Sequence, residues 1–233
     1  MPSAADVGKI IARGIGPVAT SIVTPQIAGG ALRRVLEVAI DGLGPVPSAK
    51  QVAAKALERH SGSLEAAVDG IVDSHVRLAS AQGFVANLGG LALVTVAVPA
   101  NVTGVAVLQV RMIAAIAHLR GYDLNDSRVR TALVMCLLGG EQIGRFIAEG
   151  KLPTSPMAVA TAPVFDPDLD RRVAEEVVSD LTTRIGGKNV ALMVTKRVPI
   201  VGGGIGAVMD GIGTRQIGKY AKGELALRRA LRG

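Results

Sequence analysis

Between Arg77 and Arg111, 33 consecutive residues carry no charged side chain. A stretch of this length has to be buried, either inside the protein or in a bilayer, which about 20 apolar residues can span. The pair Gly89 and Gly90 interrupts it, Pro99 lies near its middle, and it contains no Trp or Tyr that could mark a membrane interface. We therefore expect a central apolar helical hairpin that bends near Pro99. The alternative is that residues 78–110 insert in a bilayer, permanently or under some conditions.

Helical periodicity dominates the remainder of the chain, and no run of alternating polar and apolar residues indicates a β-sheet. In residues 28–44, apolar side chains recur at the spacing of one helix face, and glycines and prolines then end the pattern. Ser48 and Ser63 are the predicted N-caps of the next two helices. We expect an all-α fold, with one compact, glycine-rich helical domain over residues 1–233.

The composition indicates a core of small aliphatic side chains. Hydrophobic residues make up 49% of the chain, aromatic residues only 2%, and 29 residues are glycine. A chain this apolar can bury enough surface to fold, and it is not of the disordered class. Two segments differ from the rest: residues 151–170 hold four prolines and are predicted to form a surface loop, and residues 215–233 are predicted to form a basic C-terminal helix.

Two features indicate the compartment. The single cysteine, Cys136, cannot form an internal disulfide, which fits a reducing environment. The N-terminal residues lack the succession of a basic, an apolar and a small-residue segment that a secretory signal peptide has. We expect a cytoplasmic protein that lies at the periphery of the inner membrane where it contacts lipid.

The glycine-rich stretch "VGGGIGAVMDGIG" begins at Val201 and contains the spacing G-x-G-x-x-A of dinucleotide-binding loops. That motif requires a preceding strand in a parallel sheet, and Pro199 is incompatible with a central strand. At helical spacing the same residues form a wide face of small side chains, which lets two helix backbones approach closely. The predicted close-packing positions are Gly202, Gly206, Ala207 and Gly211.

Asp210 lies on this small-residue face and has to find a partner if it is buried. Arg111 is one candidate, and Asn101 and Gln109 lie eight residues apart on one side of the uncharged stretch. We expect these four residues to form a buried polar cluster. The cluster would either fix the register of the helices, as a structural ion pair or cap, or bind the headgroup of a ligand.

The C-terminal part of the chain is strongly basic. From Leu181 onward there are ten basic and two acidic residues, a local charge of +8, while the whole chain carries +7. Such a charge attracts nucleic acid or anionic lipid. Nucleic acid is not the expected partner because aromatic stacking residues and a recognition motif are missing, and the long uncharged stretch suits lipid. The predicted lipid contacts are Arg215, Lys219, Lys222, Arg228, Arg229 and Arg232.

The residues suggest no catalytic site, metal site or cofactor. His60, His75 and His118 are far apart in sequence, without the short spacing of metal ligands, and each is expected to be a surface or core histidine. No phosphate-binding loop, nucleophile elbow or Cys–His pair is present. An enzyme that acts on a hydrophobic substrate, with Asp210 and Arg111 as its polar centre, stays as a lesser alternative.

Two segments resemble a known family. "AQGFVANLGGLALVTVAVPANVTGVAVLQVRMIAAIAHLRGYDL" (81–124) and "VPIVGGGIGAVMDGIGTRQIGKYAK" (198–222) are similar to the two motifs of the bacterial EcsC protein family. The family has no agreed activity or cofactor, and its glycine-rich apolar helices are similar to the senescence-type domains of lipid-droplet-associated proteins. The resemblance implies a bacterial protein in contact with lipid.

The sequence as a whole favours a lipid-binding or membrane-surface-associated helical protein whose partner is anionic lipid or the inner membrane surface. The alternative is a soluble structural or oligomerising scaffold, in which the uncharged segments bury each other or a neighbouring copy. A homo-oligomer fits either interpretation.

Overall fold

The computed structural model describes residues 25–44, 46–88, 94–194 and 199–226. In these residues the helices are α2 (Pro25–Asp41), α3 (Ala49–Arg59), α4 (Leu64–Leu88), α5 (Val94–Leu119), α6 (Ser127–Cys136), α7 (Gly139–Ala148), α8 (Pro156–Thr161), α9 (Pro167–Val194) and α10 (Pro199–Glu224). This part of the chain contains no β-sheet and only an isolated bridge between Leu43 and Val46. The predicted all-α fold class is confirmed.

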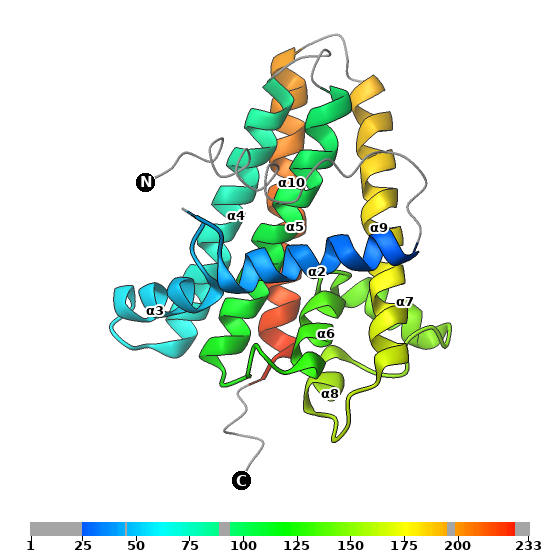
Figure 1. Ribbon diagram of the computed structural model, residues 1–233. Coiled ribbons are helices and arrows are strands. Elements are labelled where there is room, and N and C mark those ends of the chain that lie inside the picture. Colours follow the sequence, from blue (N-terminus) through cyan, green and yellow to red (C-terminus); the bar gives the residue numbers. More distant parts are fainter. Residues whose placement is uncertain (1–24, 45, 89–93, 195–198, 227–233) are drawn as a thin grey trace.

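The long helices α4, α5 and α10 stand side by side in the centre of the molecule (Figure 1). Helix α2 crosses in front of them, where it contacts α5 and α9, and α3 packs against α4 and α5. Helices α6, α7 and α8 lie together at the lower end beside the first half of α9. The buried core between these helices is mostly Ala, Val, Leu, Ile and Met, as the composition predicts.

Short-range signals define the helix boundaries. Ser48 is the N-cap of α3 and forms a capping box, in which its hydroxyl accepts from the backbone N–H of Gln51 and the Gln51 side chain accepts from the backbone N–H of Ser48. Asp126 caps α6 by accepting from the backbone N–H of Arg128. Helix α2 ends before Gly42, whose φ of +83° favours glycine.

We expect Gly42→Ala to lower the free energy of unfolding by about 2 kcal/mol, because a side chain is strained at this φ and the added Cβ would lie 2.6 Å from the carbonyl oxygen of Val46. Gly44→Ala is the matched control: its φ is +56° but the added Cβ meets no atom within 4 Å, so we expect about 1 kcal/mol. Urea unfolding of the three proteins measures the difference. Equal losses would show that the contact with Val46 contributes nothing.

Helices α4 and α5 pack against each other as the predicted hairpin, but the expected position of the bend is wrong. Helix α4 ends at Leu88, and helix α5 begins at Val94 and continues through Pro99, so the chain does not change direction at Pro99 as expected. A proline removes one backbone hydrogen bond, and a helix can continue past that loss where neighbouring helices hold it. Within the described residues, no single helix is long and apolar enough to cross a membrane. Helices α6 and α7 together have sufficient length and apolarity, but they are bent by 106° relative to each other.

Two predicted segments also need correction. The loop expected at 151–170 contains α8, and α9 begins within it at Pro167. Both helices begin with a proline, which is well tolerated there because a backbone N–H in the first turn of a helix has no hydrogen-bond partner within the helix. The basic helix expected at 215–233 is not separate: residues up to Glu224 continue α10 from the glycine-rich stretch without a break. Residues 227–233 lie outside the described part of the chain.

Candidate functional site

The small-residue face of α10 lies against α4, and the two helices approach closely. A Cβ added to Gly211 would lie 2.3 Å from the hydroxyl oxygen of Ser80, and one added to Gly218 would lie 2.8 Å from Cγ1 of Val72. A larger residue at either position would require the Ser80 or Val72 side chain to move, so glycine favours this close approach. The packing of three other predicted positions lies outside the described side chains: Gly202, Gly206 and Ala207.

Polar side chains are buried where α4, α5 and α10 meet, and we call four of them the central polar strip: His75, Gln109, Arg111 and Thr214. The Gln109 amide nitrogen donates to the Thr214 hydroxyl at 3.1 Å, and Arg111 Nε donates to His75 Nε2 at 3.5 Å. Asp210 is buried on α10, one turn before Thr214, and makes contacts of its own. The strip joins three helices through residues more than 30 positions apart.

The hydrogen bonds of His75 define which ring nitrogen carries the proton. Nδ1 lies 2.8 Å from the carbonyl oxygen of Ile71, which can only accept, so Nδ1 is the donor. Nε2 is then unprotonated and accepts from Arg111. Burial and the neighbouring guanidinium lower the pKa of His75 from 6.5 to about 4, so the ring is neutral at physiological pH.

Arg111 is a buried cation, 3% exposed, and its Nη1 atom has no hydrogen-bond partner. Burial lowers its pKa to about 10, so the guanidinium still carries its charge at pH 7. The sequence suggested Arg111 as a partner of Asp210, but the hydrogen bond that the structure describes for Arg111 is to His75, because its side chain lies at the α4–α5 contact. The Asn101 side chain lies outside the described part of the structure.

A row of carboxylates on α4 faces two of the basic residues of α10. Glu65, Asp69 and Asp73 are four residues apart and therefore lie on one side of α4. The distance from Lys222 Nζ to Asp69 Oδ1 is 2.6 Å and to Glu65 Oε2 3.6 Å, and Arg215 Nη2 lies 3.5 Å from Asp73 Oδ1. The hydrogen bond to Asp69 raises the pKa of Lys222.

These ion pairs change the interpretation of the basic C-terminal residues. Arg215 and Lys222 were expected to contact lipid, but both pair with α4 because α10 runs antiparallel beside it. Lys219 is exposed and forms no ion pair with the residues that the structure describes. The other three predicted contacts, Arg228, Arg229 and Arg232, lie outside the described residues.

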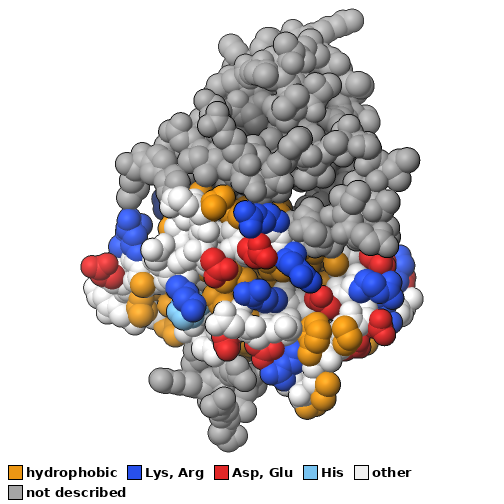
Figure 2. Space-filling view, viewed as in Figure 1, with side chains coloured by type: hydrophobic (Ala, Val, Ile, Leu, Met, Phe, Trp, Pro, Cys, Tyr) orange, Lys and Arg blue, Asp and Glu red, His pale blue; other side chains and the backbone are white. Residues whose placement is uncertain are grey.

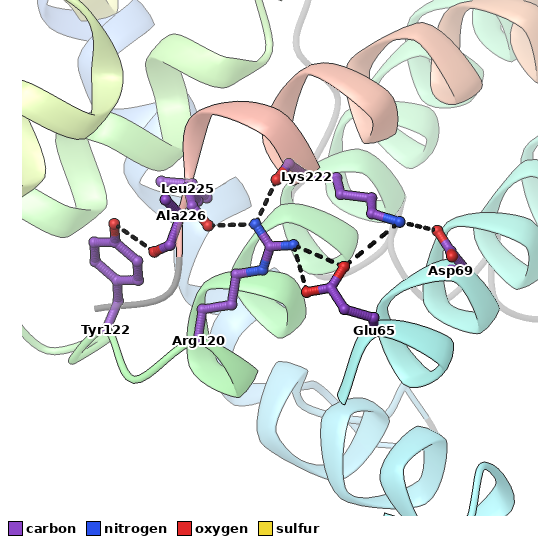
Figure 3. A network of polar contacts seen from close by, with 7 residues as sticks. All are labelled: Glu65, Asp69, Arg120, Tyr122, Lys222, Leu225 and Ala226. Carbon is purple, nitrogen blue, oxygen red and sulfur yellow. Dashed lines mark hydrogen bonds and ion pairs between the residues drawn. The ribbon is translucent and has the colours of Figure 1, made fainter. Parts of the chain in front are cut away.

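A buried arginine at the end of α5 holds the C-terminal end of α10 (Figure 3). Arg120 donates through Nη1 to the carbonyl oxygens of Lys222 and Leu225, the latter at 2.7 Å, and through Nη2 to Glu65 at 3.0 Å. The Tyr122 hydroxyl donates to the carbonyl oxygen of Ala226, the residue after Leu225, at 3.1 Å. The last carbonyls of a helix have no partner within the helix, and here Arg120 supplies one.

One exposed side of α10 is apolar at one end and basic at the other. Val208, Met209 and Ile212 are 58%, 47% and 54% exposed. At steps of three to four residues the same face continues to Arg215 and Lys219, which are also exposed. We call these five residues the outer face of α10. An apolar group of this kind next to cations is a common feature of surfaces that bind a partner or a membrane.

The face of the molecule seen in Figure 2 has a different character. Over its described part, basic and acidic side chains are intermixed, with apolar side chains between them. Several charged side chains of the described residues are paired over short distances in the sequence, for example Arg34 with Glu37 at 3.2 Å and Lys151 with Glu149 at 2.9 Å. This mixed surface does not favour a nucleic acid backbone, which requires an extended basic patch.

No group of three or more His, Cys, Asp and Glu side chains among the described residues is arranged to hold a metal ion. Cys136 is fully buried, and burial raises the pKa of its thiol well above the usual value, so it is not a reactive nucleophile. The other notable features of the described residues are the exposed outer face of α10 and the buried central polar strip.

Comparison with protein-family models finds no match to this chain, and neither the curated proteins nor the solved structures give one. The resemblance to the EcsC family therefore stays a prediction. Sequence reasoning missed the network around Arg120 and the row of carboxylates on α4. The spacing of four residues between Glu65, Asp69 and Asp73 was a signal for the row, but nothing local indicated which cations it faces.

Proposed function

We propose that this protein binds reversibly to the surface of anionic membranes through the outer face of α10. The observation that carries the proposal is the exposure of Val208, Met209 and Ile212 on the same helix face as Lys219. On a membrane the apolar end would enter the headgroup region and the basic end would face anionic lipid headgroups. The net charge of +7 also attracts the protein to an anionic membrane surface.

The size of the expected contributions indicates weak, reversible binding. Burying the exposed half of three aliphatic side chains contributes about 1 kcal/mol each, and a basic residue near an anionic surface adds about 1 kcal/mol. The sum, about 4 kcal/mol, corresponds to a dissociation constant in the millimolar range of accessible lipid. Arg215 is left out of this sum, because Asp73 already neutralises part of its charge. The proposed target is the cytoplasmic side of the bacterial inner membrane, in line with the EcsC resemblance.

We expect the double variant Val208→Ser/Ile212→Ser to bind anionic vesicles about 30-fold more weakly than the wild type, because it loses about 2 kcal/mol of apolar burial. Flotation with vesicles of phosphatidylglycerol and phosphatidylcholine measures the bound fraction. Binding should also fall when salt is raised, because the charges on the outer face are exposed.

The matched control is Val164→Ser, which makes the same chemical change at an exposed position between α8 and α9, away from α10. Its flotation should equal that of the wild type. Wild-type protein that fails to float, or a double variant that floats as well as the wild type, would contradict the proposal. A dimer in native mass spectrometry that the double variant dissociates would instead support the scaffold alternative.

A further inference from the structure

Arg111 is a charged group in the interior whose bonding is incomplete. The residue is 3% exposed, its guanidinium is protonated at neutral pH, and its Nη1 atom has no hydrogen-bond partner. Buried cations are nearly always paired with an anion, because leaving a charge unpaired in a medium of low polarity is costly. The position of Arg111 in a three-helix contact therefore needs an explanation other than packing.

The neighbours of Arg111 do not complete its bonding. His75 is neutral and offers Nε2 only to Arg111 Nε, since its other nitrogen donates to Ile71. The Gln109 amide nitrogen donates to Thr214. The two free N–H groups of Nη1 consequently require an acceptor that the surrounding described side chains do not supply. A guanidinium with free N–H groups is well suited to the oxygens of phosphate and carboxylate groups.

We propose that Arg111, held by His75, anchors an anion-binding site between α4 and α5 that takes an oxygen of a phosphate or carboxylate group. The anion is either a free ion or the headgroup of a single lipid molecule, since both present the same oxygens. His75 is a positioning residue: its acceptor nitrogen binds Arg111 Nε and so fixes the orientation of the guanidinium. The site does not depend on the outer face of α10, which carries the proposal made above.

Thermal unfolding of the wild-type protein with added anion tests the site. The two probes are inorganic phosphate and dihexanoylphosphatidic acid below its micelle concentration, each at constant ionic strength set with sodium chloride. At a concentration ten times the dissociation constant we expect a rise in Tm of about 4 °C. A rise with both probes assigns the site to the phosphate group itself, and a rise with the lipid alone assigns it to a lipid headgroup.

The decisive variant is Arg111→Met, which keeps the length of the side chain and removes the charge. Without anion its Tm should equal or exceed that of the wild type, since a buried unpaired charge is replaced by an apolar group. With either probe its Tm should not change. Arg111→Gln serves as a second variant in case the methionine protein does not fold, with the same expected loss of response.

Two controls separate this site from other effects. Arg34→Met removes an exposed arginine that pairs with Glu37, and its response to both probes should equal that of the wild type. The double variant Val208→Ser/Ile212→Ser should also keep the full response, so that a failure of membrane binding leaves the result unaffected. The proposal is overturned if the wild type shows no rise with either probe, or if Arg111→Met shows the same rise.

Discussion

Replacing Arg120 with methionine is expected to lower the free energy of unfolding by about 3 kcal/mol and Tm by about 9 °C. Arg120 is 6% exposed, and its guanidinium bonds the carbonyl oxygens of Lys222 and Leu225 and the carboxylate of Glu65. The variant removes all of these bonds and leaves the helix carbonyls without their partner. Chemical denaturation followed by circular dichroism measures the loss.

Two variants with smaller expected effects show which bonds matter. Glu65→Gln keeps the bonds from Arg120 to the carbonyls, and we expect a loss of about 1 kcal/mol. Lys222→Met breaks mainly exposed ion pairs, which contribute 1 kcal/mol or less. If Arg120→Met cost no more than either of these, the end of α10 would be held by apolar packing, for example that of the buried Leu225.

Acid is expected to destabilise the protein through His75 by about 3 kcal/mol between pH 7 and pH 4. The pKa of His75 is about 4 in the folded protein and 6.5 in the unfolded chain, so between these values the unfolded chain binds a proton that the folded protein does not. The contribution is therefore fully present above pH 6.5 and is lost as the pH falls to 4. The physical cause is burial beside the Arg111 cation.

The difference between the wild type and His75→Asn isolates this effect. Asparagine does not titrate, and its amide can still donate to the carbonyl of Ile71, while the carboxylates titrate equally in both proteins and cancel. Urea unfolding at pH 7, 6, 5 and 4 gives the two stability curves, which should converge or cross as the pH falls. His118→Asn is the control: the pKa of His118 is also lowered, but the residue is only partly buried, so its curve should stay closer to that of the wild type. A pH-independent difference for His75→Asn would contradict the prediction.

The candidate site was only partly accessible to sequence reasoning. The polar residues Gln109, Arg111 and Asp210 were singled out because they interrupt apolar or small-residue faces, and all three are buried. Their hydrogen-bond partners were not predictable, because they are distant in sequence. His75 is 36 residues from Arg111, and Thr214 is 105 residues from Gln109. The exposure of Val208, Met209 and Ile212 was not predicted, because it depends on which other helices cover α10.

The sequence by itself determined the helical class and several helix boundaries. The capping box of Ser48 and the end of α2 at Gly42 involve residues within four positions of each other, so local physical chemistry is sufficient to specify them. Only the tertiary structure decided that α10 is one helix up to Glu224 and that Arg215 pairs with α4. The reason is geometric: which faces of two helices meet depends on the relative position and tilt of the helices. Position and tilt follow from the packing of the whole core, so no single segment of the sequence specifies them.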